Sequence, residues 1–268
     1  MSSSTIQVTN SNELSVPSST SRLVLQMARR DIATLFRTPW IIISRGLAFI
    51  IQLFVFAYLI SGLVVKFPGF FPYYAVGSVV SIVASISFII GYDIFEEAEE
   101  GLLDYLLTLP IPRRDFIIGR ALGGAIRAMI YTIPMFAIVA VLENFSNPLS
   151  LLAAVLDLFL LAFGVTGLSI TVAVCVRSAN RFDVVLALLE LAVSRASTAL
   201  YPLAFMPSYV AALAPFSPVT FAADSTRAAL FGFSLDLPGL AGLLAFVAIF
   251  LGLGATFYFR RLEGGVYA

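Results

Sequence analysis

The sequence predicts an all-α protein that crosses a membrane several times, and its composition and patterning support that fold class. Of the 268 residues, 60% are hydrophobic and only 12% are charged, and the mean hydropathy is +0.98. Soluble domains carry about 25% charged residues. Six apolar stretches near bilayer length follow one another along the chain. Because a helix satisfies its backbone polar groups internally, we expect each stretch to cross the membrane as a helix.

The residue types exclude several classes of function. The chain has no histidine and a single cysteine, Cys175, which lies inside an apolar run. Metal clusters, disulfide frameworks and histidine-based proton relays are therefore not expected. Sixteen basic and sixteen acidic side chains give a formal net charge of zero, and no basic patch indicates a nucleic-acid partner. We expect no metal site, no catalytic residue and no bound nucleic acid.

The first 45 residues are expected on one side of the membrane. Residues 1–21 are rich in Ser, Thr and Asn and lack the features of a signal peptide, which predicts a disordered cytosolic tail. Residues 22–45 predict an amphipathic helix along the inner leaflet, in which Pro39 turns the chain toward the bilayer and Trp40 is an interfacial anchor. The pattern favours a plain membrane anchor and a docking surface equally.

Residues 46–268 are expected to form one transmembrane domain with six spans. Each span supplies on the order of 20 apolar residues, enough to cross roughly 30 Å of hydrocarbon. An even number of crossings puts both termini on one side of the membrane. The spans are expected over Gly46–Val65, Phe70–Tyr92, Phe116–Leu142, Leu149–Val176, Val184–Leu200 and Leu237–Phe259.

The placement of arginine predicts that both termini are cytoplasmic, because basic residues accumulate in cytoplasmic loops. Twelve arginines lie at the ends assigned to that side, against Lys66 and Arg227 at the other. We therefore expect a multi-pass protein of the cell membrane. The twelve are Arg22, Arg29, Arg30, Arg37, Arg45, Arg113, Arg114, Arg120, Arg177, Arg181, Arg260 and Arg261.

The segment between the fifth and sixth spans, Tyr201 to Asp236, is apolar but repeatedly interrupted by proline. No piece of it is long enough to cross a bilayer. Two pieces of roughly ten residues, Phe205–Ala214 and Phe221–Phe231, predict short re-entrant or interfacial helices in the outer leaflet.

A charged segment separates the second span from the third. Four glutamates precede Gly101, and four leucines then recur at helical spacing until Pro110. This pattern predicts a short amphipathic helix in the cytosol, and exposed leucines favour partner docking. The alternatives are a solvated loop and a leucine stripe resting on the membrane surface. The residues are Glu96, Glu97, Glu99 and Glu100, then Leu102, Leu103, Leu106 and Leu107.

Arg127, Asp157, Glu190 and Arg195 fall inside the predicted spans, where each unpaired charge costs on the order of 3 kcal/mol. Positions along the helices predict two cross-helix ion pairs, Asp157 with Arg195 and Arg127 with Glu190. For Arg127 and Asp157 a packing role is favoured. For Glu190 and Arg195 a packing role and a role in a substrate pathway are equally supported.

Two ordered motifs resemble those of the membrane subunits of type-2 ATP-binding-cassette exporters. The first is an acidic stretch, a glycine and a leucine-bearing helix that ends in Leu-Pro before a basic span; here it is Glu99, Glu100, Gly101, Leu102, Leu103, Tyr105, Leu109, Pro110 and Arg113. The second lies in the outer segment and is Tyr201, Pro202, Leu203, Pro207, Ser217, Pro218, Val219, Thr220, Phe221, Asp224 and Arg227. Ser217 and Phe221 replace the family's usual Asn and Tyr. The resemblance runs from Arg22 to the last span.

The resemblance implies that two such permeases pair, as a homodimer or with a second permease, and that each docks a coupling helix into a separate nucleotide-binding subunit. That partner would bind ATP and Mg²⁺, since Lys66 is the only lysine and lies in no phosphate-loop motif. The chain itself would be a transport subunit without enzymatic activity. The coupling residues implied are Glu99, Glu100, Gly101, Leu102, Leu103, Tyr105, Leu106, Leu107, Leu109, Pro110 and Arg113.

The resemblance also implies an outer gate and a substrate pathway. Glu190 and Arg195 are the pathway candidates, because the fifth span resembles the family's dimer-facing helix. The cargo would be an amphipathic, lipid-like, drug or glycan molecule moved outward. The alternative is a secondary transporter or channel without an ATPase, supported mainly by Glu190. The outer gate residues implied are Tyr201, Pro202, Pro207, Pro218, Thr220, Asp224 and Arg227.

Overall fold

The computed structural model describes residues 39–57, 59, 69–100, 113–176, 178–232 and 234–264. Within these ranges every regular element is helical, which confirms the all-α class. Short 3₁₀ turns at Leu203–Phe205 and Ala214–Phe216 flank α9. The other elements are α2 (Pro39–Ile51), a π-helical turn η1 (Gln52–Ala57), α4 (Phe70–Glu99), α6 (Arg113–Leu142), α7 (Pro148–Cys175), α8 (Ala179–Arg195), α9 (Ser208–Leu213), α10 (Pro218–Gly232) and α11 (Leu237–Gly264).

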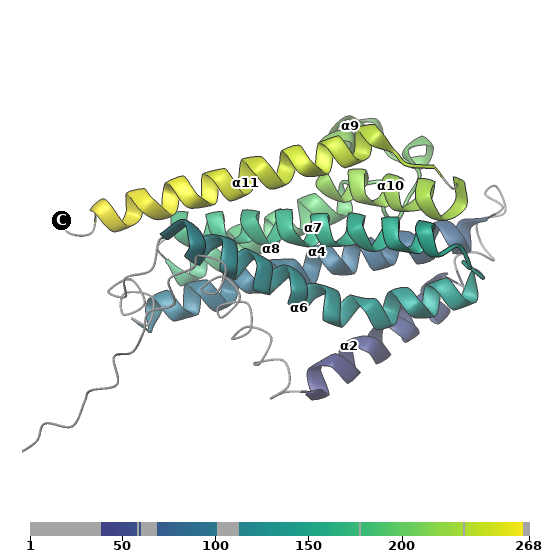
Figure 1. Cartoon of the computed structure of the whole chain (residues 1–268), viewed down its shortest axis with the longest axis horizontal. Helices are drawn as coiled ribbons and strands as arrows, with labels where there is room; N and C mark the ends of the chain where they lie inside the picture. Colours follow the sequence, from purple (N-terminus) through teal and green to yellow (C-terminus); the bar gives the residue numbers. More distant parts are fainter. Residues whose placement is uncertain are drawn as a thin grey trace, which may run out of the picture.

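Four long helices, α4, α6, α7 and α11, form the body of the molecule and run along its long axis (Figure 1). Each contains a stretch long and apolar enough to cross a membrane. These stretches coincide with the second, third, fourth and sixth predicted spans, so the membrane-spanning character of the chain is confirmed. They are Phe70–Glu97, Ile117–Leu142, Pro148–Cys175 and Leu237–Phe257.

The helix of the first predicted span begins earlier than expected. α2 starts at Pro39, where a proline in the first helical turn sacrifices no hydrogen bond, and it continues without a break past Arg45. Its apolar part, Gly46–Phe56, is shorter than a full span within the described residues. The expected tail and most of the expected inner-leaflet helix, residues 1–38, lie outside those residues, as does most of 58–68.

The helix of the fifth predicted span lies earlier in the chain than expected, because α8 begins at Ala179 and not at Val184 and ends at Arg195 and not at Leu200. After Arg195 the chain turns, and the Ser197 hydroxyl donates to the Ser194 carbonyl at 2.6 Å. Such local hydrogen bonds compete with helix continuation. With 17 residues, α8 is much shorter than α4, α6, α7 and α11, which have 28 to 30 residues.

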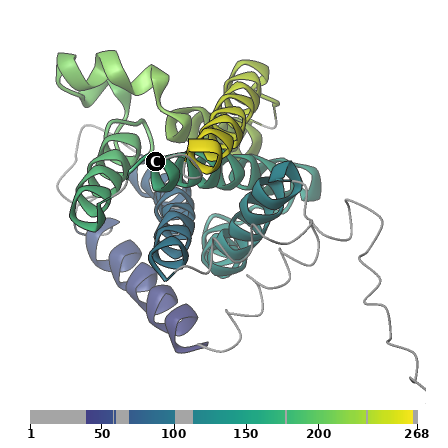
Figure 2. The same ribbon diagram turned by 90° about the vertical axis from the view of Figure 1, so that its left-hand side faces the viewer.

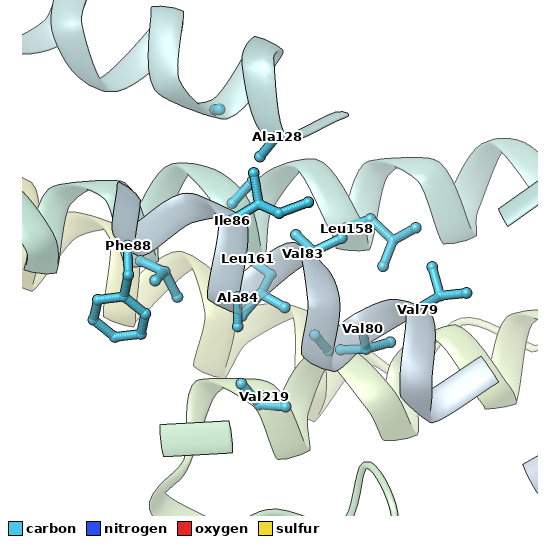
Figure 3. Close-up of a cluster of buried hydrophobic side chains, with 14 of the residues drawn as sticks. Val79, Val80, Val83, Ala84, Ile86, Phe88, Ala128, Leu158, Leu161 and Val219 are labelled. Atoms are coloured by element: carbon cyan, nitrogen blue, oxygen red, sulfur yellow. The ribbon is translucent and has the colours of Figure 1, made fainter. Parts of the chain in front are cut away.

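The core is centred on α4, which packs against α6, α7, α8 and α10. Figure 2, an end-on view, shows α4 surrounded by its neighbours. Val79, Val80 and Val83 of α4 face Leu158 and Leu161 of α7, and all five side chains are buried (Figure 3). In contrast, only 11% of the apolar window of α11 is buried, so that helix presents most of its surface outward.

Close contact between α4 and α7 depends on Gly91. A Cβ atom built there would lie 2.2 Å from the Ser169 hydroxyl and 3.0 Å from the Ser169 carbonyl oxygen. The same hydroxyl donates to the Phe88 carbonyl at 2.9 Å. Small residues and interhelical hydrogen bonds of this kind stabilise helix packing in membranes, where lipid removes the hydrophobic drive for association.

We expect Gly91→Ala to destabilise the bundle by about 1–3 kcal/mol, because the added methyl must displace Ser169 and its hydrogen bond. The thermal unfolding midpoint of the purified protein in detergent measures the effect. Gly252→Ala in α11 is the matched control, since a Cβ there meets nothing within 4 Å. Equal midpoints for the two variants would contradict the close crossing.

Candidate functional site

The long helices give the molecule two ends (Figure 1). At one, named here the Glu99 end, α4 ends, α6 begins and α7 ends. At the other, the Asn147 end, α6 is connected to α7, and α8 is connected to α11 through α9 and α10. The described borders of the expected coupling helix, Glu99 and Arg113, therefore lie at the end opposite the expected outer gate.

Two ion pairs join α4 to α6 toward the Glu99 end. Arg127 Nη1 lies 2.6 Å from Asp93 Oδ2, and Arg120 Nη2 lies 3.1 Å from Glu97 Oε2. The two carboxylates are four residues apart and the two arginines seven apart, so each pair of like residues shares one helical face. The ion pairs therefore fasten together the two helices that border residues 101–112.

Both predicted cross-helix pairs were wrong. Arg127 pairs with Asp93 because α4 stays helical beyond Tyr92 and carries Asp93 alongside α6. Asp157 is only 2% exposed and hydrogen-bonds with Ser225, because α10 packs against α7. Neither Glu190 nor Arg195 takes the partner that helix positions suggested.

The leucine-bearing part of the expected coupling helix lies outside the described residues. Of the implied coupling set, Glu99 and Glu100 follow one another at the end of α4, both exposed, and Arg113 is the first residue of α6. The remaining members are Gly101, Leu102, Leu103, Tyr105, Leu106, Leu107, Leu109 and Pro110.

At the Asn147 end, Arg227 of α10 is the centre of a buried polar network. Its Nη1 donates to the Thr198 carbonyl at 3.1 Å and to Asp224 Oδ1 at 3.3 Å. Its Nη2 donates to the Tyr73 carbonyl at 3.0 Å and also to the Ala199 carbonyl. The guanidinium carbon lies 3.5 Å from the centroid of the Tyr73 ring, a cation–π contact. One side chain thus joins α10, the turn after α8 and the start of α4.

Neighbouring hydroxyls extend this network. Thr220 Oγ1 accepts from the Thr198 N–H at 3.1 Å, and the Thr198 hydroxyl donates to Asp224 Oδ1 at 2.9 Å. The Tyr73 hydroxyl donates to the Thr198 carbonyl at 2.6 Å. Burial raises the pKa of Asp224 above its ordinary value, although the Thr198 hydrogen bond and the charge of Arg227 oppose that rise.

Three of the implied gate residues, Thr220, Asp224 and Arg227, therefore converge on one turn. Tyr201 lies half exposed just beyond that turn, and Pro218 is the first residue of α10. Pro202 and Pro207 precede the first 3₁₀ turn and α9, where proline's fixed φ favours a helix start. The gate prolines thus shape the backbone and lie outside the hydrogen-bonded network.

Sequence reasoning missed Tyr73, Gly77 and Thr198. The turn carbonyl of Ala199 approaches α4 so closely at Gly77 that a Cβ there would lie 1.6 Å from the Ala199 oxygen. Tyr73 is 154 residues away from Arg227, and its acceptor is a backbone carbonyl. No spacing rule within the outer segment points to such a partner.

Glu190 and Arg195 are brought together by a cavity of about 240 Å³ between α8, α4 and η1. Polar groups of Gln52, Ser81, Ser85 and Ser194 line the same space. The Ser81 and Ser194 hydroxyls are buried and have no hydrogen-bond partner. Among the described residues no ion pair joins Glu190 to Arg195. The lining of the cavity therefore presents one acidic and one basic side chain that do not pair with each other.

A second hollow of about 520 Å³ adjoins this cavity and shares Gln52, Arg195 and Leu200 with it. Its other lining residues are mostly apolar or aromatic: Ala48, Ile51, Phe56, Tyr74 and Tyr201. In the part of the chain that the structure describes, no three His, Cys, Asp or Glu side chains gather closely enough to hold a metal ion.

Four helices of membrane-spanning length, with a polar cavity beside them, define a helical membrane protein. The family model for the ABC-2 type transporter matches residues 22–231. The chain therefore belongs to the ABC-2 type transporter family, the membrane subunits of type-2 ABC transporters. This confirms the resemblance carried by the two sequence motifs. No curated protein sequence matches the chain.

A double-mutant cycle tests the Asp93–Arg127 pair. We expect Arg127→Gln to destabilise the protein because it leaves Asp93 unpaired, and Asp93→Asn to recover part of that loss, with a coupling energy of about 1–3 kcal/mol. Chemical unfolding in detergent measures it. The control cycle combines Arg127→Gln with Glu190→Gln, for which additive effects are expected. Additivity in the first cycle would contradict the pairing.

Replacing Arg227 by lysine tests the geometry of its network. A lysine keeps the charge but lacks the planar fork that reaches several acceptors, so we expect Arg227→Lys to lower the free energy of unfolding by about 2–4 kcal/mol. Arg181→Lys, at an exposed position of α8, is the matched control and should change little. A stability loss of the same size in both variants would contradict a stabilising role for the hydrogen bonds of Arg227.

Proposed function

We propose that this chain is the permease subunit of an ATP-driven exporter. It moves an amphipathic, lipid-like, drug or glycan substrate outward, and a separate nucleotide-binding subunit hydrolyses ATP with Mg²⁺. The observation that carries the proposal is the pair of ion pairs between α4 and α6, because they brace the two helices on which a partner bound at residues 101–112 would act.

The path from such a partner to the substrate runs through α4. This helix bears Asp93 and Glu97 near the Glu99 end, Ser81 and Ser85 in the charged cavity, and Tyr73 in the Arg227 network. A displacement of its end is carried along a rigid helix to both other regions, since packed helices move as units. The coupling region, the transport pathway and the gate would then all be connected through α4.

The remaining assignments follow from this role. Glu190 and Arg195 line the substrate pathway. The turn held by Arg227, together with α9 and α10, forms an outer gate whose helices enter the outer leaflet. Both termini are cytoplasmic, the chain lies in the cell membrane with six crossings, and it acts as a pair with a second copy or with a second permease. The gate residues are Tyr201, Pro202, Pro207, Pro218, Thr220, Asp224 and Arg227.

A second candidate is a secondary transporter or channel that works without an ATPase. The observation that favours it is the Glu190 carboxylate in a polar cavity, where coupling-ion residues are found in such transporters. It is the weaker candidate because its cavity has one carboxylate and no second acidic ligand for an ion.

Purification of the tagged full chain from its native membrane distinguishes the two candidates. We expect a nucleotide-binding subunit to copurify with magnesium-dependent ATPase activity. Leu103→Glu with Leu107→Glu should reduce its recovery about tenfold or more, because both leucines would be buried in the partner. Leu235→Glu, exposed at the Asn147 end, is the control and should leave recovery unchanged.

Two results would overturn the exporter proposal. The first is recovery of no nucleotide-hydrolysing chain under conditions that keep the permease folded. The second is solute transport by the purified permease alone in vesicles without ATP, which would favour the second candidate.

A further inference from the structure

We propose that the cavity at Glu190 and Arg195 binds an amphiphile whose headgroup is a zwitterion in the order hydrocarbon chain, anion, cation, as in an alkylphosphocholine. This inference rests on the proposed function, and it specifies the substrate class of the same cavity. Its argument comes from the charges, the unpaired hydroxyls and the relation between the two hollows.

The cavity suits a ligand that carries both charges. Glu190 and Arg195 are five residues apart on α8, about 7.5 Å along the helix axis, and they form no ion pair with each other. Charges at membrane depth are stable only with a partner or water. A headgroup with a cation and an anion separated by a short spacer offers a counter-charge to both residues, whereas a singly charged ligand offers one to only one of them and a neutral ligand to neither.

Unsatisfied hydroxyls indicate a polar ligand in the same space. The Ser81 and Ser194 oxygens are buried without a partner, and Ser194 is only 6% exposed. Buried polar groups are almost always hydrogen-bonded in folded proteins. Both residues line the cavity that contains Glu190, so their hydroxyls could donate hydrogen bonds to the anionic oxygens of a headgroup bound there.

The order of the groups follows from the position of Arg195. Arg195 lines both hollows, whereas Glu190 lines only the smaller one. The larger hollow is lined mainly by apolar and aromatic side chains, including Ile51 and Phe56, and suits a hydrocarbon chain. A ligand with its chain in the larger hollow therefore meets Arg195 first and Glu190 second, which places its anion next to the chain and its cation at the far end.

Three probes with the same alkyl chain test this order. Dodecylphosphocholine has the proposed order, a dodecyl sulfobetaine has the two charges reversed, and dodecyl phosphate lacks the cation. Binding to the full chain in maltoside micelles is measured by displacement of a fluorescent alkylphosphocholine. We expect dodecylphosphocholine to bind roughly tenfold or more tightly than the reversed sulfobetaine.

Substitutions at Glu190 and Arg195 test which charge of the ligand each side chain contacts. Glu190→Gln should weaken dodecylphosphocholine roughly tenfold but should not weaken dodecyl phosphate, whose retained binding also shows that the variant is folded. Arg195→Gln should weaken both, and Arg195→Lys should restore part of the affinity. Glu143→Gln in the α6–α7 connection and Arg181→Gln on α8 remove the same charges elsewhere and should have no effect.

Equal affinity for the two zwitterions, or wild-type binding by Glu190→Gln and Arg195→Gln, would overturn the inference. The assay needs neither ATP nor a partner. Selective binding without ATP-driven transport would therefore refute the exporter proposal and leave the assigned headgroup order standing. ATP-driven transport with no preference among the probes would refute the headgroup order and leave the exporter proposal standing.

Discussion

The structure depends on one constraint: a charged or polar group inside a membrane bundle needs a partner supplied by the protein. Arg120 and Arg127 meet it with carboxylates of α4, and Arg227 meets it with Asp224 and three backbone carbonyls. Apart from the Arg227–Asp224 pair within α10, each of these contacts joins segments that apolar packing alone would hold in many similar arrangements. The ionic contacts favour the one arrangement in which each charged side chain lies beside its partner.

The helix that carries most of these contacts is also the most buried of the four long helices, with 78% of its apolar window inside the molecule. α4 packs on four other helices and contributes to both ends and to the cavity wall. A central rigid element reduces the number of independent motions of the bundle, because displacement at one end is shared by every contact along it. The charged cavity beside α4, in contrast, is lined by two buried hydroxyls, those of Ser81 and Ser194, that have no hydrogen-bond partner.

Sequence patterns predicted the four full-length apolar helices and the family, because length, hydropathy and two ordered motifs are local properties. They misplaced the bounds of α8, which begins before the predicted span and ends at Arg195, just before the turn in which the Ser197 hydroxyl bonds to the Ser194 carbonyl. They also failed for the partners of Arg127 and Asp157, because position along a helix does not say which neighbour lies beside it. The sequence did not point to Tyr73, because Arg227 bonds to its backbone carbonyl oxygen and every residue type has that atom.

That last feature has an evolutionary consequence. Three acceptors of Arg227 are carbonyl oxygens of Tyr73, Thr198 and Ala199, and any amino acid at those positions would present the same atom. These backbone acceptors make no demand on residue type, whereas the Tyr73 ring and hydroxyl, the Thr198 hydroxyl and the bare backbone at Gly77 each depend on a particular residue. Selection should therefore leave its mark on those positions and on Arg227, and relatives should vary more freely at Ala199, which gives the network only its carbonyl oxygen.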